Sequence, residues 1–462
     1  MLASFGYAVV VLFIVLIMTK RLSAIVALIL IPLAAGLLVG KGDVLGDAVL
    51  DGIRSLAPTA ALLTFAILFF SVMIDVGLFD PLVRLALKVS GADPVKIAVA
   101  TAVLTLLVSL DGDGSSTYLI VCAAFLPLYD RLGMSRLVLA TIALLAVACT
   151  NLTPWGGPVS RASSALKVEP AEIFLPMIPV MIAGALATVI VAGVLGLRER
   201  RRLTWAGVSF AEVMAGDGVT PSSGSVGASG SAGAGDSAEP VEPEGADGAA
   251  DPLAAWHRRV YWVNAALTLG LMACLVLEVW PLALLFATGF ALAMLVNFPQ
   301  VAEQGRRINS YSSSVIPIIS LILAAGVFVG VLEGTGMVDA MGAALVGVIP
   351  DGLGTFYGPL VAVTALPLTF ALSNEAYYFG VLPLLAEGGA AHGLSAAEVA
   401  RAALTGAPVH ALSPLVASLY LLSGRLQLNL GDLQRKALPW ALAVSVVMIA
   451  ATLLTGAVPV GR

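Results

Sequence analysis

The sequence has little charge and few cysteines, and each shortage excludes a class of protein. Asp, Glu, Lys and Arg make up only 11% of the 462 residues, whereas a soluble chain carries about 25%, so a string of two or three soluble domains is excluded. The three cysteines, Cys122, Cys149 and Cys274, lie in apolar stretches, which indicates buried thiols rather than a disulfide framework or a metal set. The formal net charge of −5 gives no reason to expect a nucleic-acid partner.

What the sequence has in abundance is apolar chain. Hydrophobic residues make up 59% of it, and the mean hydropathy is +0.99. Apolar runs long enough to cross a bilayer recur from end to end, which predicts an all-α polytopic membrane protein in a cell inner (plasma) membrane. The first run lacks a basic segment before it and a cleavage site after it, so we expect a retained helix. The clearest spans are 3–19, 22–40, 56–77, 172–197, 260–277 and 281–298.

Residues 97–129 contain two apolar arms that are each too short to cross a hydrocarbon core of about 30 Å. Ser-Leu-Asp-Gly-Asp-Gly-Ser-Ser-Thr-Tyr separates them at 109–118, and basic residues flank both outer ends. This pattern predicts a re-entrant hairpin whose tip is buried in protein or lines a wet cavity. Two carboxylates at such a depth require a cation or a proton, so Asp111 and Asp113 are candidates for metal or proton coupling; a solvated surface loop is the alternative. Ser115 and Ser116 begin the returning arm, where helix N–H groups suit a bound carboxylate or where the hydroxyls only cap the helix.

Residues 137–166 form a second unusual span, interrupted by Asn-Leu-Thr-Pro-Trp-Gly-Gly-Pro at 151–158. Prolines and glycines at this density predict a discontinuous helix rather than a plain kink. We expect Thr153 to cap a new half-helix that begins at Pro154. Asn151 offers a donor and an acceptor at the break, and Gly156 and Gly157 allow close approach of a ligand to the backbone.

The second half of the chain repeats these features at a nearly constant distance. Gly77-Leu-Phe-Asp80 recurs 259 residues later at Gly336-Met-Val-Asp339, Leu110-Asp-Gly-Asp113 recurs 262 residues later at Leu372-Ser-Asn-Glu375, and Thr153-Pro154 recurs 260 residues later at Ser413-Pro414. A duplicated unit is therefore predicted. Its copies are residues 1–202 and 256–462, the second with a hairpin at 355–386 and a broken helix at 396–422. A Gly-, Ser- and Pro-rich linker at 203–255 joins them and is expected to be disordered.

Basic residues predict that the two copies are inverted. Each copy holds about five transmembrane helices besides its hairpin, and an odd number of crossings inverts the second copy. With Arg198–Arg202 placed in the cytoplasm, 18 of the 24 Lys and Arg residues fall on that side, as the positive-inside rule requires. The predicted outer segment from Gly336 to Gly393 contains neither Lys nor Arg. The linker is then cytoplasmic, and both termini are extracellular.

The second half supplies further candidate residues. Ser373, Asn374 and Glu375 correspond to the first hairpin tip, and Tyr377 follows them. Glu375 is a candidate proton or cation group, or else a structural acid with a partner elsewhere. Ser413 is expected to cap the second half-helix.

Two further polar residues lie at membrane depth. Arg161 follows the first break and suits a substrate carboxylate, or else its side chain extends outward to the bilayer surface. His410 is either a proton relay or a hydrogen-bonded core histidine.

These motifs resemble the bacterial metal–citrate:proton symporter family, part of the wider ion-transporter superfamily. The segments that carry the resemblance are 109–118 and 151–158, and it covers both halves apart from the linker. It implies import of citrate complexed with a divalent or trivalent metal such as Mg or Ca, coupled to protons, by a dimer in which hairpins and broken helices move against a scaffold (an elevator). The metal travels with the substrate, so no permanently bound cofactor is expected. Val159-Ser160 replaces the Thr-Ala that family members have before Arg161, which leaves the metal preference open.

Two alternative functions share some of these sequence features. A sodium-coupled di- or tricarboxylate carrier or a cation/proton antiporter of the same superfamily would use the same architecture. An intramembrane aspartyl protease is the enzyme alternative, suggested by Gly112-Asp113-Gly114. It needs a second aspartate at the same depth, and Asp130 beside Arg131 is poorly placed for this role, so we do not expect an enzyme.

Overall fold

The structure is a computed structural model, and it describes residues 2–19, 21–91, 93–205, 252–277, 279–346 and 356–459. Within these ranges every regular element is a helix. The first half contains α1 (Leu2–Met18), α2 (Ala24–Leu38), α3 (Leu45–Asp75), α4 (Asp80–Ser90), α5 (Pro94–Val108), η1 (Ser109–Asp111), α6 (Gly114–Arg131), α7 (Arg136–Thr150), α8 (Gly157–Leu166) and α9 (Pro170–Trp205). The second half contains α11 (Pro252–Val276), α12 (Leu282–Asn297), α13 (Val301–Gly334), α14 (Met337–Val346), α16 (Tyr357–Ala371), η2 (Ala376–Val381), α17 (Leu382–Ala391), α18 (Ala396–Leu404), α19 (Ala407–His410), α20 (Ala417–Arg425) and α21 (Leu430–Leu454). The predicted all-α class is confirmed.

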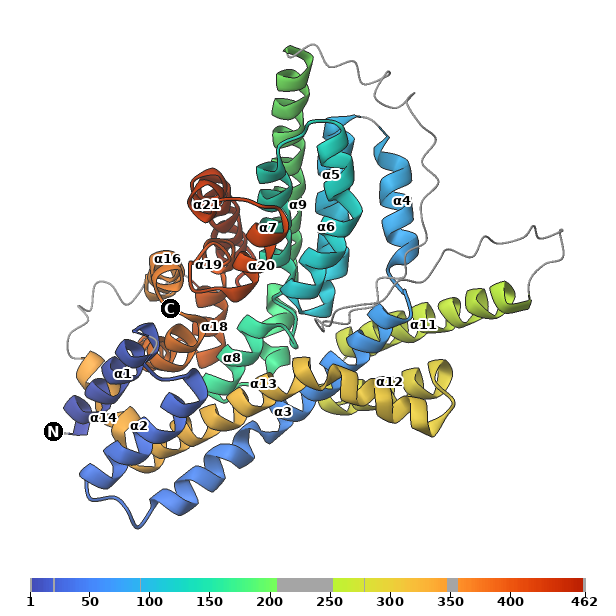
Figure 1. The fold of residues 1–462 in the computed structure, drawn as a ribbon. Coiled ribbons are helices and arrows are strands. Elements are labelled where there is room, and N and C mark those ends of the chain that lie inside the picture. Colours follow the sequence, from blue (N-terminus) through green and yellow to red (C-terminus); the bar gives the residue numbers. More distant parts are fainter. Residues whose placement is uncertain are drawn as a thin grey trace.

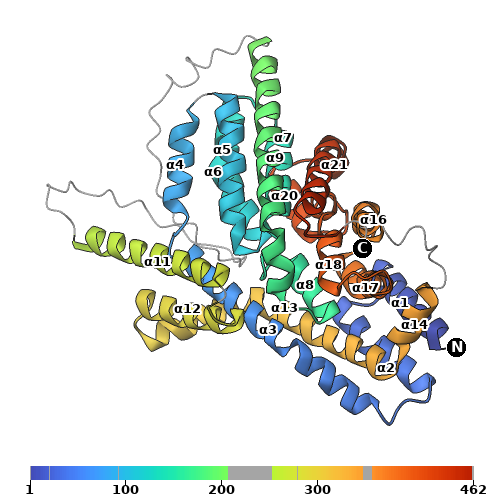
Figure 2. The ribbon, with the colours of Figure 1, turned by 180° about the vertical axis from the view of Figure 1, so that it is seen from behind.

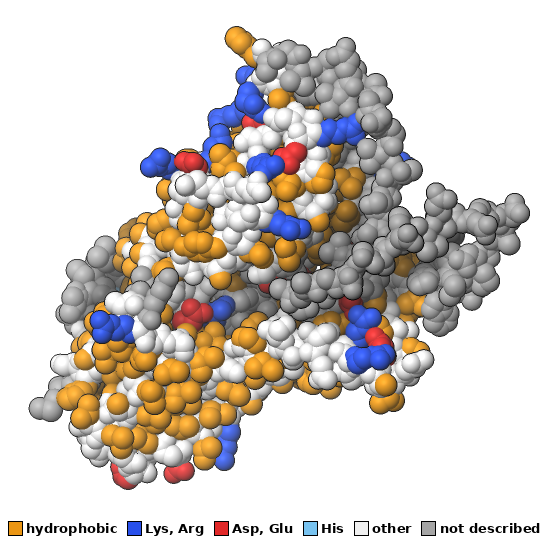
Figure 3. All heavy atoms as spheres, viewed as in Figure 1, with side chains coloured by type: hydrophobic (Ala, Val, Ile, Leu, Met, Phe, Trp, Pro, Cys, Tyr) orange, Lys and Arg blue, Asp and Glu red, His pale blue; other side chains and the backbone are white. Residues whose placement is uncertain are grey.

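Several helices are long and apolar enough to cross a membrane. Five described elements meet both criteria: α3, the α5–η1 stretch, α9, α13 and α21. Apolar side chains cover much of the visible face, and Lys and Arg side chains gather at the upper end of the upright bundle (Figure 3). The chain is therefore a membrane-embedded protein.

The helices form an upright bundle and an oblique layer below it (Figure 1). The bundle contains α4–α7, α9 and α19–α21, and the layer is built on α3 and α13, which lie side by side in both views (Figures 1 and 2). Small residues allow these two backbones to touch: a Cβ on Gly326 would lie 2.9 Å from the Gly52 carbonyl oxygen, and Gly330 contacts the same turn. Membrane helices associate closely through such small residues. We call α1–α3 and α11–α13 the scaffold.

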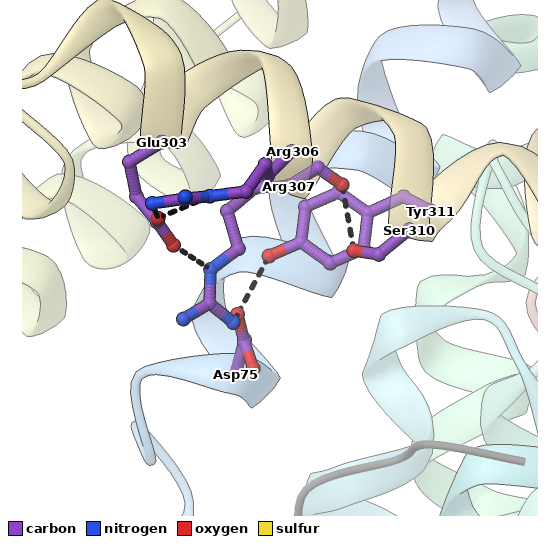
Figure 4. A network of polar contacts seen from close by, with 6 residues as sticks. All are labelled: Asp75, Glu303, Arg306, Arg307, Ser310 and Tyr311. Atoms are coloured by element: carbon purple, nitrogen blue, oxygen red, sulfur yellow. Dashed lines mark hydrogen bonds and ion pairs between the residues drawn. The ribbon is translucent and has the colours of Figure 1, made fainter.

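A polar cluster joins α3 and α13 at one end (Figure 4). Arg307 pairs with Asp75 at the end of α3 and, at 2.7 Å, with Glu303 one turn earlier on α13. The Tyr311 hydroxyl donates to the same Asp75 carboxylate at 2.8 Å. The two scaffold helices are therefore fastened both by glycine packing and by charge.

The hairpin α5–η1–α6 has both of its outer ends at one end of α9. Arg200 lies 3.8 Å from Asp93, which precedes α5, and Arg202 donates to the Gly133 carbonyl that follows α6. Glu199 accepts a 3.1 Å hydrogen bond from the Ser135 N–H. The first arm therefore begins, and the second arm ends, at the same end of α9, and the tip lies further along α9 within the bundle.

The second hairpin, α16–η2–α17, starts from the opposite end of the bundle. A Cβ on Gly358 in its first arm would touch Val458, just beyond α21. Helices α9 and α21 are antiparallel, because Arg198 stacks over Trp440 whereas Gly184 contacts Met448. The end of α21, where the second hairpin begins, therefore lies far from Arg198 and from the end of α9 where the first hairpin begins.

Element bounds differ from the predicted ones by a few residues at most ends. The largest difference is α3, which begins at Leu45 rather than near residue 56. Polar residues such as Asp47 and Asp51 lower the hydropathy of residues 45–55, so the sequence did not indicate this first part of the helix. In the structure Gly52 packs it against α13. Most of the predicted linker 203–255 lies outside the described residues, although α9 and α11 continue into its two ends.

Candidate functional site

The tip of the first hairpin uses its two aspartates in different ways. Asp111 is 5% exposed and accepts hydrogen bonds from the Asp113 N–H at 2.9 Å and the Ser116 hydroxyl at 2.8 Å. Asp113 is exposed, and its two carboxylate oxygens accept from the N–H groups of Ser115 and Ser116 at 3.0 and 3.1 Å. Asp113 is thus the N-cap of α6, and the serines are the capped residues rather than the caps. Its carboxylate is the one open to a bound cation.

The first break lies against this tip. The Trp155 indole Nε1 donates a 2.9 Å hydrogen bond to the Leu110 carbonyl, and the Ser109 and Thr150 hydroxyls bond to each other. Gly112 has φ +84°, and a Cβ there would lie 2.7 Å from Trp155 Cδ1. Trp155, which the sequence motif does not single out as a site residue, packs the tip and the break against each other.

The predicted helix caps at the two breaks are wrong. Helix α8 begins at Gly157 with Gly156 as its N-cap, and α20 begins at Ala417 with Val416 as its N-cap. Thr153 instead closes a tight turn, because its carbonyl accepts from the Gly156 N–H at 2.8 Å. The Pro154 ring therefore lies in this turn, and Pro158 occupies the first turn of α8.

Ser413 also lies within a turn. It is buried, and its Oγ accepts from the Leu415 N–H at 3.3 Å. Both half-helices nevertheless start at the breaks, so their positive dipole ends lie there.

Arg161 on α8 contacts the second hairpin rather than extending outward. Its Nη2 lies 3.3 Å from Glu375 Oε1, and the two side chains are 19% and 20% exposed. A Cβ on Gly157 would lie 2.7 Å from Arg161 Nη1, so the guanidinium folds back over the first turn of α8. His410 is close enough to interact electrostatically with both members of this pair.

His410 is held in a defined orientation. Its Nδ1 lies 2.6 Å from the Thr369 carbonyl. A carbonyl can only accept, so the ring N–H is on Nδ1 and the neutral ring has an acceptor at Nε2. His410 is therefore a hydrogen-bonded histidine that also lies within electrostatic range of Glu375.

Several buried polar atoms around the breaks have no hydrogen-bond partner within the described part of the chain. An unsatisfied buried polar atom costs about 1–3 kcal/mol, so a set of them in one region favours a polar ligand that completes them. Ser373 is not in this set, because its Oγ accepts from the Ala376 N–H at 3.2 Å. The atoms are Asn151 Oδ1, Thr153 Oγ1, Arg161 Nε, Asn374 Oδ1, Tyr377 Oη and His410 Nε2.

The tip of the first hairpin and Arg161 both adjoin one short segment. The first hairpin contacts it at Trp155, and the second contacts it at Arg161, six residues later. Six residues span at most about 20 Å even when fully extended, and four of these steps are helical. The tip that carries the exposed Asp113 therefore contacts this segment at Trp155, and the cation at Arg161 lies within about 20 Å of Trp155 along the chain. No group of three or more His, Cys, Asp or Glu side chains suited to a resident metal occurs in the described ranges.

Two contacts join this region to the scaffold, and the sequence pattern indicated neither. Trp155 packs edge-on against Phe286 of α12, with ring centroids 4.7 Å apart, and lies 5.4 Å from Phe70 of α3. Lys167, which follows α8 with φ +53°, pairs with Glu333 near the end of α13.

Comparisons with known proteins agree with this architecture. Residues 13–406 match the family model described as "Citrate transporter". In Bacillus subtilis (strain 168), the "Citrate transporter" is 45% identical over 99% of both chains, and the "Mg(2+)/citrate complex secondary transporter" is 44% identical over all of both chains. The solved Alcanivorax borkumensis YdaH transporter, described as having an unusual topology, covers 92% of this chain, and this chain covers 90% of it, with a TM-score of 0.62 at 16% identity. The last likeness concerns the fold alone.

These relatives are transporters, which sets the aspartyl-protease alternative aside. The family-model match and the identity over the full length show that this chain belongs to the citrate transporter family.

Proposed function

We propose that the protein imports citrate as a complex with a divalent or trivalent metal, coupled to protons. The observation that carries this proposal is that two opposite charges adjoin one short segment of the chain. The first hairpin tip, which carries the exposed Asp113, contacts the break at Trp155, and Arg161 lies six residues along the chain from Trp155. A metal–citrate complex has the complementary polarity, with a hard cation that prefers oxygen ligands and carboxylates that suit a guanidinium and helix N-termini. The relative named for the Mg(2+)/citrate complex favours Mg²⁺ as the first metal to test.

In this proposal each group has a stated role. Asp113, with Asp111 fixing the tip behind it, faces the metal or its water shell. Arg161 holds a citrate carboxylate, and the backbone at Gly156 and Gly157 approaches it closely. The Thr153 and Tyr377 hydroxyls donate to the remaining oxygens of citrate, whereas the Asn151 and Asn374 side-chain oxygens accept from the citrate hydroxyl or from bound water.

We further propose that the halves 1–202 and 256–462 are inverted repeats and that transport is elevator-like. Support comes from the hairpins, which start from opposite ends of the antiparallel pair α9 and α21. The hairpins and broken helices would move against the scaffold within a homodimer in the cell membrane. The Arg198–Arg202 end then faces the cytoplasm, and the termini face outside.

Uptake of labelled citrate into proteoliposomes, with a panel of metals, tests the function. We expect accumulation that requires both a metal and an inward proton gradient. Accumulation of citrate without metal, or driven by a sodium gradient alone, would favour the di- or tricarboxylate carrier instead.

A further inference from the structure

Glu375 is paired with the Arg161 guanidinium, which is the group that the proposed function assigns to a citrate carboxylate. Its single contact of 3.3 Å is longer than the 2.7–2.9 Å of a charge-assisted hydrogen bond. Arg161 Nε has no partner among the described residues. The guanidinium therefore retains unused donors, and its present carboxylate is held loosely.

We propose that Glu375 is an internal substitute for the substrate carboxylate and that their exchange on Arg161 couples transport to a proton. When a citrate carboxylate pairs with Arg161, Glu375 loses its counter-ion in a site that is four-fifths buried. An unpaired carboxylate in such surroundings takes up a proton. One ion pair breaks, one forms, and the proton comes from water to a Glu375 carboxylate oxygen. This inference rests on the proposed function and adds the residue that carries the proton.

The groups around Glu375 support this role for it. Glu375 faces Arg161, which belongs to α8, and His410, which belongs to α19. The neutral form of His410 presents only an acceptor at Nε2. Tyr378 of its own hairpin lies within electrostatic range of Arg161. The neighbouring helix α1 carries no charged residue. Glu387 lies three turns further along the same arm, at a cavity that residues of α1, α8, α13 and α14 also line and that includes Glu333. Arg161 is therefore the cation that this structure places directly against Glu375.

The exchange has a thermodynamic consequence. If substrate binding takes up a proton, the affinity for the complex falls as the pH rises, because the free protein then holds fewer protons than the bound state. Removing the Glu375 carboxylate removes both the group that competes with citrate for Arg161 and the group that takes up the proton. Glu375→Gln should therefore bind the complex at least as tightly as the wild type and show a weaker pH dependence.

The test measures protons directly in the purified full-length protein. Titration calorimetry of citrate with excess Mg²⁺, in buffers of different ionisation enthalpy, gives the number of protons taken up on binding. We expect Glu375→Gln to take up roughly one proton fewer than the wild type; the protonation of citrate itself cancels in this difference. In proteoliposomes the variant should retain counterflow but lose the acceleration of uptake by an inward proton gradient. Glu375→Asp, which keeps a carboxylate, should retain both properties.

A matched control is Glu398→Gln, which removes an acid but keeps the helix-capping box at Ser395; it should behave as wild type. Unchanged proton uptake and an unchanged gradient response in Glu375→Gln would overturn the exchange. So would loss of binding in both Glu375 variants, because Glu375 would then be part of the site itself. If the wild type neither binds nor transports citrate with any metal, the proposed function fails instead.

Discussion

The Trp155 indole donates a 2.9 Å hydrogen bond to the main-chain carbonyl of Leu110, and this bond joins the break of one helix to the tip of the first hairpin. The same ring packs against Phe286 and Phe70 of the scaffold. Trp155 is thus the point where hairpin, broken helix and scaffold meet.

Trp155→Phe should lower stability by about 1 kcal/mol, the net value of one hydrogen bond, because the ring packing is kept. Trp155→Ala should cost about 3–5 kcal/mol, because a large buried side chain is removed. Thermal unfolding in detergent checks both values. Trp280→Phe is the control at a half-exposed tryptophan and should change little; equal losses at the two positions would argue against a special role for Trp155.

Asp113→Asn separates the two roles of this aspartate. Asparagine caps a helix as well as aspartate does, so the unfolding temperature should stay near that of the wild type. The charge that faces the metal is lost, so the apparent affinity for Mg²⁺ in citrate uptake should fall at least about tenfold, equivalent to about 1.4 kcal/mol. Asp93→Asn changes the matching N-cap at the start of the same hairpin and should leave the Mg²⁺ dependence unchanged. If both variants respond alike, Asp113 does not face the metal.

Gly112→Ala should be more damaging than its backbone angle alone predicts. A left-handed alanine costs about 1–2 kcal/mol, and here the new Cβ would also lie 2.7 Å from Trp155 Cδ1. Gly40→Ala is the control, because Gly40 has a similar φ of +76° with open space around it. Thermal unfolding and uptake check this prediction. A larger loss of stability at Gly112 than at Gly40, together with a loss of uptake, would show that Trp155 is packed closely against the tip. Equal losses would mean that the tip can move aside.

The sequence was most informative where the structure is governed by local chemistry. Short apolar arms around Asp111 and Asp113 predict a hairpin, and clustered prolines and glycines predict a broken helix, because each depends on neighbouring residues only. The predicted start of α8 is wrong. Trp155 donates a hydrogen bond to the carbonyl of a residue 45 positions away, and the chain around it forms a turn instead of the first turn of a helix.

Long-range partners could not be predicted for the same reason. The pairing of Arg161 with Glu375 joins the two halves of the chain, and no spacing within either half encodes it.

The pair of Lys167 and Glu333 provides a test of movement between the site and the scaffold. Lys167 follows α8, whereas Glu333 belongs to α13, so an elevator motion must separate them. In a chain whose native cysteines are replaced, a short thiol cross-linker between Lys167→Cys and Glu333→Cys should abolish uptake, and cleavage of the linker should restore it.

The matched control is the pair of Asp75 and Arg307, which joins two scaffold helices (Figure 4). The same cross-linker between Asp75→Cys and Arg307→Cys should leave uptake near the uncross-linked rate, because α3 and α13 are packed backbone to backbone and are expected to move as one body. Uptake that survives cross-linking at 167 and 333 would show that α8 does not move against α13, and the elevator proposal would have to be abandoned. Inhibition at both pairs would instead mean that the scaffold itself deforms during transport.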